Sequence, residues 1–462
     1  MKDPAAEDKV LPGQKKIWRA GTLTYTTAGL AMLFGWLLWG DFSWNLKERA
    51  ITPVAQLMLR GFSAPDWLVG LLIGSLPAGI GLILGPIICV KSDRARTRWG
   101  RRIPFLLLPT PFIALAMFGL AVTPSLGANL HEALGATSPG LVVCRLAMFG
   151  FFWTAFEILS ISVNCLFGAL INDVVPSAVI GQFYGLFRAV SLVAGIIFNY
   201  WLMGKAETHY FEIFVALGLI YGIGFSLMCL KVKEGDYPQP PPVVDMPEGR
   251  GRRMLESLVL YFKECYSSPF YLRFFLATTL GGLALQPVNT FSVFHARSVG
   301  MSDDLYGKCL ALSYMVSLLL AVPLGILADR FHPSRLGIFC MGCYAAVTAY
   351  GFAFALDSKS FFVAFLLHTV LAGTYMTATA SIGQRLLPKE KFGQFASAGG
   401  IVWGLLSMVL PPALGVFIEK SNHDYRFVFL LACLLATASG ITYCSVYHRY
   451  KRLGGDKDYK AP

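Results

Sequence analysis

Hydrophobic residues occur in long runs that are separated by shorter polar segments. Each run has about 20 residues or more, the length that an α-helix needs to cross the roughly 30 Å hydrocarbon core of a bilayer. The pattern therefore predicts twelve transmembrane helices in an all-α membrane protein. The runs lie near 22–57, 67–90, 103–124, 140–171, 182–203, 211–231, 271–296, 304–328, 336–356, 361–383, 396–418 and 427–447.

One long polar insertion falls between the sixth and the seventh run, and it includes the Pro-rich stretch 237–242. An insertion of this kind reads as a linker, so it divides the chain into two halves of six helices. We expect five parts: a tail at 1–20, a six-helix bundle at 21–231, a linker at 232–270, a second bundle at 271–447 and a tail at 448–462.

Composition excludes a soluble protein. The chain is 55% hydrophobic and only 14% charged, which is too apolar for a soluble protein of 462 residues. Its net charge of +12 could suggest nucleic acid, but the basic residues lie in loops and tails rather than on one helix face. We therefore expect no nucleic-acid partner.

The distribution of basic residues predicts the orientation of the chain in the membrane. The segment 91–102 carries six Lys and Arg between two apolar runs, and 28 of the 39 Lys and Arg lie in the tails, the linker and the loops on that side. Eight lie in segments assigned to the other side, Lys47 and Arg49 among them. Positive loops stay in the cytoplasm, so we expect both termini there, in a multi-pass protein of the plasma (inner) membrane.

Ionisable residues inside the predicted helices are the first candidates for function, because charges at membrane depth are costly. The fourth run contains Arg145, Glu157 and Asn164, with Glu157 near its middle. Arg145 precedes Glu157 by twelve residues, about 18 Å along a helix, so the two cannot pair directly. Arg188 in the fifth run is the expected partner of Glu157. The alternatives for Glu157 are a structural ion pair and a place outside the membrane.

The first run carries a second polar group. Asp41, Asn45 and Glu48 have the spacing of one helix face. If this helix continues to about residue 57, the stripe faces a central cavity and offers acceptors to a hydroxyl-rich solute. If the helix ends near residue 40, the three residues lie in an exterior loop.

Other polar and aromatic residues in the second half could complete such a cavity, since amides suit sugar hydroxyls and aromatic rings suit the apolar face of a sugar. Taken singly, each could equally serve helix packing. We find no nucleotide-binding, hydrolase or metalloprotease motif, so we expect no enzymatic activity, no cofactor and no bound metal. The candidates are Gln286, Asn289, Tyr314, His368 and Trp403.

A motif in the first basic loop resembles a known family. Asp93-Arg94 is followed by Gly100-Arg101-Arg102, and a related Gly325-Ile-Leu-Ala-Asp329-Arg330 recurs 236 residues later, which indicates duplication. This resembles the major facilitator superfamily, most closely its glycoside-pentoside-hexuronide cation symporters and sucrose-proton symporters. The resemblance implies two six-helix bundles with a cavity between them.

The resemblance also implies a cytoplasmic gate formed by Asp93, Arg94, Arg101, Arg102, Asp173, Asp329 and Arg330. Asp93 would meet the start of the eleventh helix near Gln394, and Arg101 or Arg102 would pair with Asp173. These contacts would hold the halves together on the cytoplasmic side. The alternative is that the charges only set the topology.

Two residues of the fourth helix take roles from the same resemblance. Sucrose-proton symporters carry an acid sixteen residues before the Asp that closes this helix, and Glu157 stands in that position relative to Asp173. Glu157 would then bind the coupling proton. Arg145 resembles the arginine of the superfamily's Arg-x-x-x-Gly pattern.

We conclude from the sequence that the chain is a secondary active transporter, in particular a proton-coupled symporter of a sugar-like solute. Sodium is the alternative coupling ion. A non-transporting scaffold or pigment-assembly factor with the same fold is the alternative function, and it would need no acids facing a cavity. The expected partners are the solute, the proton and the lipid bilayer, and we expect a monomer.

Overall fold

A computed structural model describes residues 17–237, 259–388 and 391–462. The N-terminal segment 1–16, most of the expected linker at 238–258, and 389–390 lie outside the described residues. So do ten side chains within the described ranges: Val90, Ala321, Val322, Gly325, Ile326, Ala328, Asp329, Gly393, Asp456 and Lys457.

Long helices make up nearly all of the structure, in agreement with the all-α prediction. Short helices extend or join them, and residues 259–266 are also helical. The long helices are α1 (Thr27–Gly61), α3 (Leu76–Arg94), α5 (Pro109–Leu134), α6 (Leu141–Val174), α7 (Ile180–Trp201), α8 (Tyr210–Lys231), α10 (Pro269–Ser298), α11 (Asp303–Arg330), α12 (Pro333–Phe354), α13 (Ser358–Thr379), α15 (Phe392–Lys420) and α16 (Phe427–Arg452). The short ones are α2 (Asp66–Val69), η1 (Gly70–Ser75), α4 (Ile103–Leu107), η2 (Gly135–Thr137), η3 (Ser177–Val179), η4 (Met203–Lys205), α14 (Ile382–Leu386) and α17 (Gly455–Asp458).

Nine helical spans in the described part of the chain are long and apolar enough to cross a membrane. This makes the protein a multi-pass membrane protein, and the twelve long helices agree with the twelve predicted runs. Helices α1, α10 and α11 are as long as the others but are not among the nine. These three helices carry polar residues into the interior, as the candidate site shows below.

In the part of the chain that the structure describes, one pair of short strands departs from the all-α fold. Strands β1 (Ile17–Ala20) and β2 (Leu23–Thr26) form an antiparallel hairpin in which Ile17 faces Thr26. Gly21 makes the tight turn with φ +56°, a conformation that glycine adopts without steric cost. The hairpin delays the first helix, which begins at Thr27 rather than near residue 22 and continues to Gly61.

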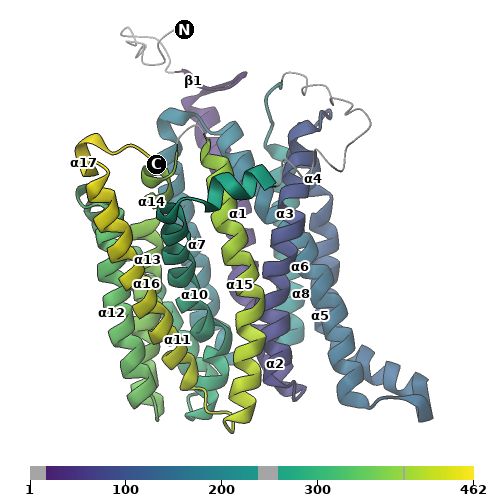
Figure 1. Ribbon diagram of the computed structural model, residues 1–462. Helices are drawn as coiled ribbons and strands as arrows, with labels where there is room; N and C mark the ends of the chain where they lie inside the picture. Colours follow the sequence, from purple (N-terminus) through teal and green to yellow (C-terminus); the bar gives the residue numbers. More distant parts are fainter. Residues whose placement is uncertain (1–16, 238–258, 389–390) are drawn as a thin grey trace.

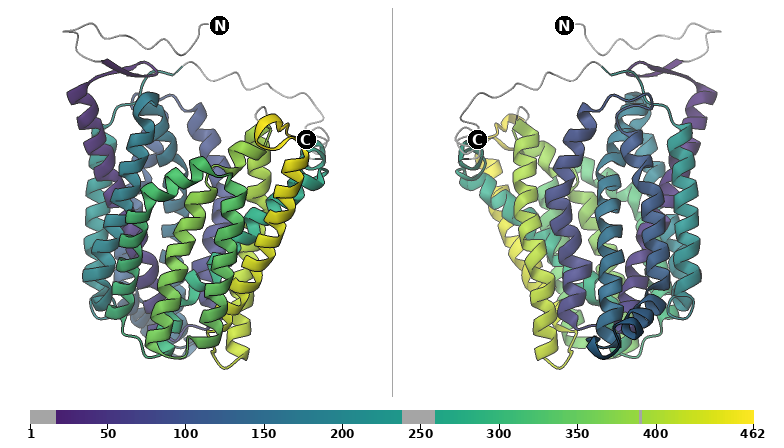
Figure 2. Two further views of the ribbon diagram at one scale, coloured as in Figure 1. Left: turned by 90° about the vertical axis from the view of Figure 1, so that its left-hand side faces the viewer. Right: turned by 90° about the vertical axis from the view of Figure 1, so that its right-hand side faces the viewer.

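The helices form two groups. Helices α1 to α8 form one group and α10 to α16 form the other, and α11 and α15 also pack extensively against the first group. The hairpin β1–β2 and the C-terminus lie at the same end of the molecule, which we call the terminal face (Figure 1). The two groups lie closer together at the opposite face than at the terminal face (Figure 2).

Contacts between the halves at the opposite face involve the second span and α15. The second span begins as α2, continues through the π-helical segment η1 and becomes α3. A Cβ atom added to Gly415 would lie 2.5 Å from the carbonyl oxygen of Asp66, so the two backbones are in close contact. The buried carboxylate of Asp66 also accepts hydrogen bonds from Tyr425, at 2.9 Å, and His423, at 2.6 Å.

A second contact between the halves joins α7 to α11 near the same face. The backbone oxygen of Asn199 lies against Gly307, where a side chain would not fit. Nearby, Arg297 pairs with both Glu207 and Asp303, each at 2.5 Å. The opposite face is therefore closed by backbone contact and ion pairs.

We predict that Gly415→Ala weakens this closure. The added methyl group would overlap the Asp66 backbone, and overpacking of this kind costs about 1–3 kcal/mol. A matched control is Gly400→Ala on the same helix, because nothing lies within 4 Å of a Cβ atom there. Thermal unfolding of the purified protein should show a lower Tm for the first variant only, and equal Tm values would contradict the packing argument.

Candidate functional site

A cavity of about 670 Å³ lies between the two halves. Helices α1 and α7 line it from one half, and α10, α11, α13 and α15 line it from the other. Among the described residues that line it, the charged ones are Glu48, Arg49 and Arg188. The rest of the wall combines apolar side chains with hydroxyl groups, such as those of Thr52 and Ser317. A cavity with a few convergent charged and amide groups is the usual form of a small-molecule site.

Lys47 is completely buried in the middle of α1. Its ammonium group contacts the carboxylate of Glu48 at 2.6 Å and donates to the hydroxyl of Ser160 on α6 at 3.1 Å. The ring of Trp44 lies 3.7 Å from the same ammonium, and that of Tyr221 lies 5.0 Å from it. A buried lysine is tolerated only with such partners. Glu48 is 40% exposed at the cavity wall, so the pair joins the cavity to the protein interior.

Glu157 lies on α6 one turn before Ser160, on the same face of the helix. Its carboxylate interacts electrostatically with both Lys47 and Glu48. Lys47 is therefore the cation whose charge acts on Glu157, and the prediction that Arg188 partners Glu157 is wrong for this structure. The reason is that α1 places its lysine against α6, whereas Arg188 reaches the other half of the protein.

Asp41 and Asn45 lie on α1 as predicted, because the helix runs past them without a break. Asp41 is completely buried and accepts a hydrogen bond from Asn45 at 2.5 Å. Asn45 in turn accepts from Ser191 on α7 at 2.7 Å, and Arg49 donates to the same hydroxyl at 3.3 Å. Of the predicted stripe, only Glu48 lines the cavity. Asp41 and Asn45 support Arg49 from behind, which corrects the prediction that all three face the cavity.

Two arginines extend from the first half to residues of the second half. Arg49 donates to the hydroxyl of Tyr314 on α11 at 3.3 Å, and its guanidinium lies 4.9 Å from the centre of that ring. Arg188 donates to the hydroxyl of Thr377 on α13 at 3.1 Å. Both arginines therefore cross the space between the halves.

The second half supplies amide and aromatic groups, largely as predicted. Gln286, Asn289, Tyr314 and Trp403 line the cavity. His368 does not line it, since it is fully buried and bonds Asn289 at 3.1 Å. Behind the cavity wall, His368 therefore fixes the orientation of an amide that a solute could reach.

Two predicted residues of α6 lie away from this cluster. Arg145 is four residues from the start of α6, and its backbone packs against Gly127 of α5. Asn164 is exposed on the same helix. The structure thus does not bring Arg145, Glu157 and Arg188 together. Arg145 lies near the start of α6, twelve residues before Glu157, and Arg188 extends toward Thr377 of α13.

At the terminal face, the basic loop 95–102 contacts the end of α6 as predicted. Arg101 binds Asp173 through two hydrogen bonds, of 2.7 and 3.1 Å, and Arg102 adds a third at 3.3 Å. Burial alone would lower the pKa of Arg101, but its bonds to Asp173 raise the pKa overall. The arginine therefore stays charged, and the loop is fixed to its own half.

Among the described residues, Asp93 does not make the predicted contact with the start of α15. Asp93 pairs with Arg102 at 2.5 Å, and Gln394 donates instead to Glu264 at 2.8 Å. The two halves are apart at this face, so Asp93 binds the nearer cation of its own loop. Arg94 and Arg330 are exposed, and the side chain of Asp329 lies outside the described part of the structure.

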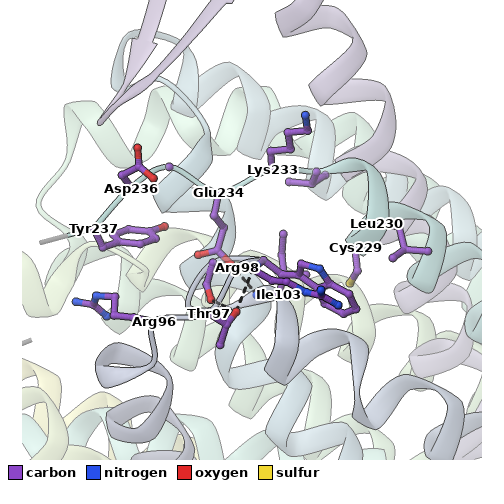
Figure 3. Close-up of a pocket in the computed structure, with 14 residues that line it drawn as sticks. Arg96, Thr97, Arg98, Ile103, Cys229, Leu230, Lys233, Glu234, Asp236 and Tyr237 are labelled. Carbon is purple, nitrogen blue, oxygen red and sulfur yellow. Dashed lines mark hydrogen bonds between the residues drawn. The ribbon is translucent and has the colours of Figure 1, made fainter. Parts of the chain in front are cut away.

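A second cavity, of about 630 Å³, lies beside this loop (Figure 3). Glu234, just after α8, points toward the loop, and its carboxylate accepts the backbone N–H groups of Arg101, Arg102 and Ile103 at 2.6–3.0 Å. These N–H groups begin the third span, where a negative charge is favourable. The start of the linker therefore anchors the loop.

Sequence reasoning missed Lys47 and Arg49, because both were assigned to the exterior side. The sequence did contain a signal for them. Asp41 became a candidate because charges at membrane depth are costly, and the same argument applies to its neighbours on the helix. Ser160, Ser191 and Thr377 carried no comparable signal, since hydroxyl groups are common in membrane helices.

Parts of the chain are similar to known sugar transport proteins. It is 26% identical over 165 residues to the sucrose transport protein SUC4 of Arabidopsis thaliana, covering 34% of this chain and 30% of that protein. It is 31% identical over 120 residues to the human proton-associated sugar transporter A, covering 25% of this chain and 15% of that one. The alignments thus span less than a third of each relative.

The fold is shared more widely. A bacterial homolog of the human lysosomal transporter Spinster, solved in an inward-facing and unoccupied conformation, superposes with a TM-score of 0.65 at 14% identity, covering 95% of this chain and all of that one. Residues 62–389 match the sequence model of one family. The chain belongs to that family, described as MFS/sugar transport protein.

Proposed function

We propose that this protein is a secondary active transporter that moves a sugar-like solute together with protons by alternating access. The observation that carries the proposal is the cavity between the halves, with ionisable groups on its wall and in the interior behind it. A volume of about 670 Å³ suits a mono- or disaccharide. The family and the names of the two relatives support a sugar as solute.

Proton coupling is assigned to Glu157, with Lys47 as its neighbouring cation. Glu157 is half-buried on α6 and has two charged neighbours, one of which, Glu48, reaches the cavity. The charged state of Glu157 depends on the balance between Lys47 and Glu48. A movement of α1 against α6 would change that balance, which is how proton binding can favour one conformation over another.

Two alternatives are less well supported. A non-transporting scaffold would leave the acids of α1 turned to lipid or solvent, whereas Asp41 is buried and Glu48 faces the cavity. Sodium coupling favours several oxygen ligands around one point. The interior cluster instead places an ammonium among its carboxylates, which suits a proton better than a second cation.

We place the terminal face in the cytoplasm of the plasma membrane, on the basis of the positive-inside rule. The cavity is closed at the opposite face and the halves separate toward the terminal face, so this conformation is open to the cytoplasm. The contacts of loop 95–102 are then those of an open gate. Asp93 would exchange Arg102 for the start of α15 when the gate closes.

Glu157→Gln should abolish proton-driven accumulation and spare exchange. The amide keeps the size of the side chain but cannot release a proton at neutral pH. Uptake of labelled mono- and disaccharides into proteoliposomes under an imposed pH gradient measures accumulation, and counterflow without a gradient measures exchange. Glu132→Gln, an exposed acid at the end of α5, is the matched control. Undiminished accumulation in the Glu157 variant would remove this residue from the coupling mechanism.

Glu48→Gln should lower the free energy of unfolding by about 3–5 kcal/mol, because it leaves the completely buried ammonium of Lys47 without its carboxylate partner. The double variant Lys47→Met/Glu48→Gln should recover most of this loss, since a neutral pair has no charge to bury. Lys308→Met breaks an exposed pair with Asp304 and should have a much smaller effect. Thermal unfolding of the four proteins checks this, and no recovery in the double variant would count against the ion pair.

The orientation is testable in a bacterial inner membrane. A green fluorescent protein fused to the C-terminus should fluoresce, and alkaline phosphatase fused there should be inactive, because the first folds in the cytoplasm and the second outside it. The reverse pattern would place the terminal face on the outside.

A further inference from the structure

Two arginines face the central cavity without a carboxylate partner. Arg49 donates to the hydroxyl groups of Tyr314 and Ser191, and Arg188 donates to that of Thr377. In the described part of the chain, neither guanidinium forms an ion pair with an acid. Their like charges are close enough to interact with each other. Arg49 is half-buried and Arg188 is exposed to the cavity, so both guanidinium groups are accessible to a solute. Charged side chains that face a cavity between membrane helices indicate a function.

The acids near these arginines are engaged elsewhere. Glu48 contacts the ammonium of Lys47 at 2.6 Å. Asp41 interacts with Arg49 only through space, is bonded to Asn45 and is completely buried, so it does not reach the cavity. The cavity wall therefore presents two guanidinium groups, and the one carboxylate beside them already has a cation.

From this geometry we infer that the solute carries a negatively charged group, and that Arg49 and Arg188 bind it. The inference rests on the proposed transport of a sugar-like solute and names its class as an acidic sugar. A guanidinium presents a planar set of donors that matches a carboxylate or a phosphate, and it binds either more strongly than it binds a hydroxyl.

The two arginines are placed so that a bound anion would connect the two halves of the protein. Both come from the first half, and both already contact the second half through Tyr314 and Thr377. An anion between them would relieve their repulsion and join α1 and α7 to α11 and α13. The amides of Gln286 and Asn289 and the ring of Trp403, 44% exposed, remain for the uncharged part of the sugar.

The test compares matched neutral and acidic sugars on the full chain in proteoliposomes. Counterflow exchange without a pH gradient is measured for glucose, glucuronate and glucose 6-phosphate, and for lactose and lactobionate. We expect an acidic sugar to exchange at a concentration at least tenfold lower than its neutral partner. Comparing the exchange of glucuronate with that of glucose 6-phosphate shows whether the site prefers a carboxylate or a phosphate.

Variants link the result to the arginines. Arg49→Gln and Arg188→Gln should each raise the half-saturating concentration of the acidic sugar at least tenfold and leave that of a neutral sugar nearly unchanged. Arg49→Lys keeps the charge but not the planar donor set, so its loss should be intermediate. Arg452→Gln, at the exposed end of α16, is the matched control. Thermal unfolding confirms that each variant is folded.

The outcomes separate this inference from the proposed function. If neutral sugars exchange as well as acidic ones, or better, the inference is wrong and sugar transport stands. If the acidic sugar binds but both arginine variants behave like the Arg452 control, the assignment to Arg49 and Arg188 is wrong. If no sugar of either kind exchanges, the proposed function fails and the inference fails with it.

Discussion

The contact between Lys47 and Glu48 is the interaction on which the interior of this protein depends. An ammonium at membrane depth cannot reach water, so its charge must be met by a carboxylate, a hydroxyl and aromatic rings at fixed positions. These partners come from α1, α6 and α8, so the lysine fixes the positions of these three helices relative to one another. The pair also connects the cavity wall at Glu48 with Glu157, and the proposed coupling of a proton to a solute would act through this connection.

The second constraint is the asymmetry between the two ends of the molecule. At the opposite face, glycines let α2, η1 and α15 meet backbone to backbone, and Asp66 binds groups of the other half. At the terminal face, Arg101, Arg102 and Glu234 hold the basic loop to its own half. Contacts within a half can persist while the halves move, whereas contacts between halves must break. The structure therefore shows which interactions belong to a rigid bundle and which to one conformation.

The sequence correctly predicted the features that depend on neighbouring residues. Runs of apolar residues long enough to span a bilayer identify the helices, and the repeated Asp-Arg motif identifies two halves. Local spacing placed Asp41, Asn45 and Glu48 on one helix face, and the resemblance to a known family paired Asp173 with the loop arginines. The strand pairing at Leu23–Thr26 was missed, because a four-residue strand at the edge of an apolar run looks like the first turn of the helix.

What only the tertiary structure decided is which charged groups meet. Lys47 is adjacent to Glu48 in sequence, yet nothing in the sequence says that Ser160, 113 residues away, completes its site. Arg188 reaches Thr377 rather than Glu157 because helix rotation and tilt, not topology, determine where a long side chain points. Periodicity tells which residues share one helix face, but packing against other helices determines what that face contacts. The sequence by itself determined the helices and the inventory of charges, and the packing of the two halves determined the site.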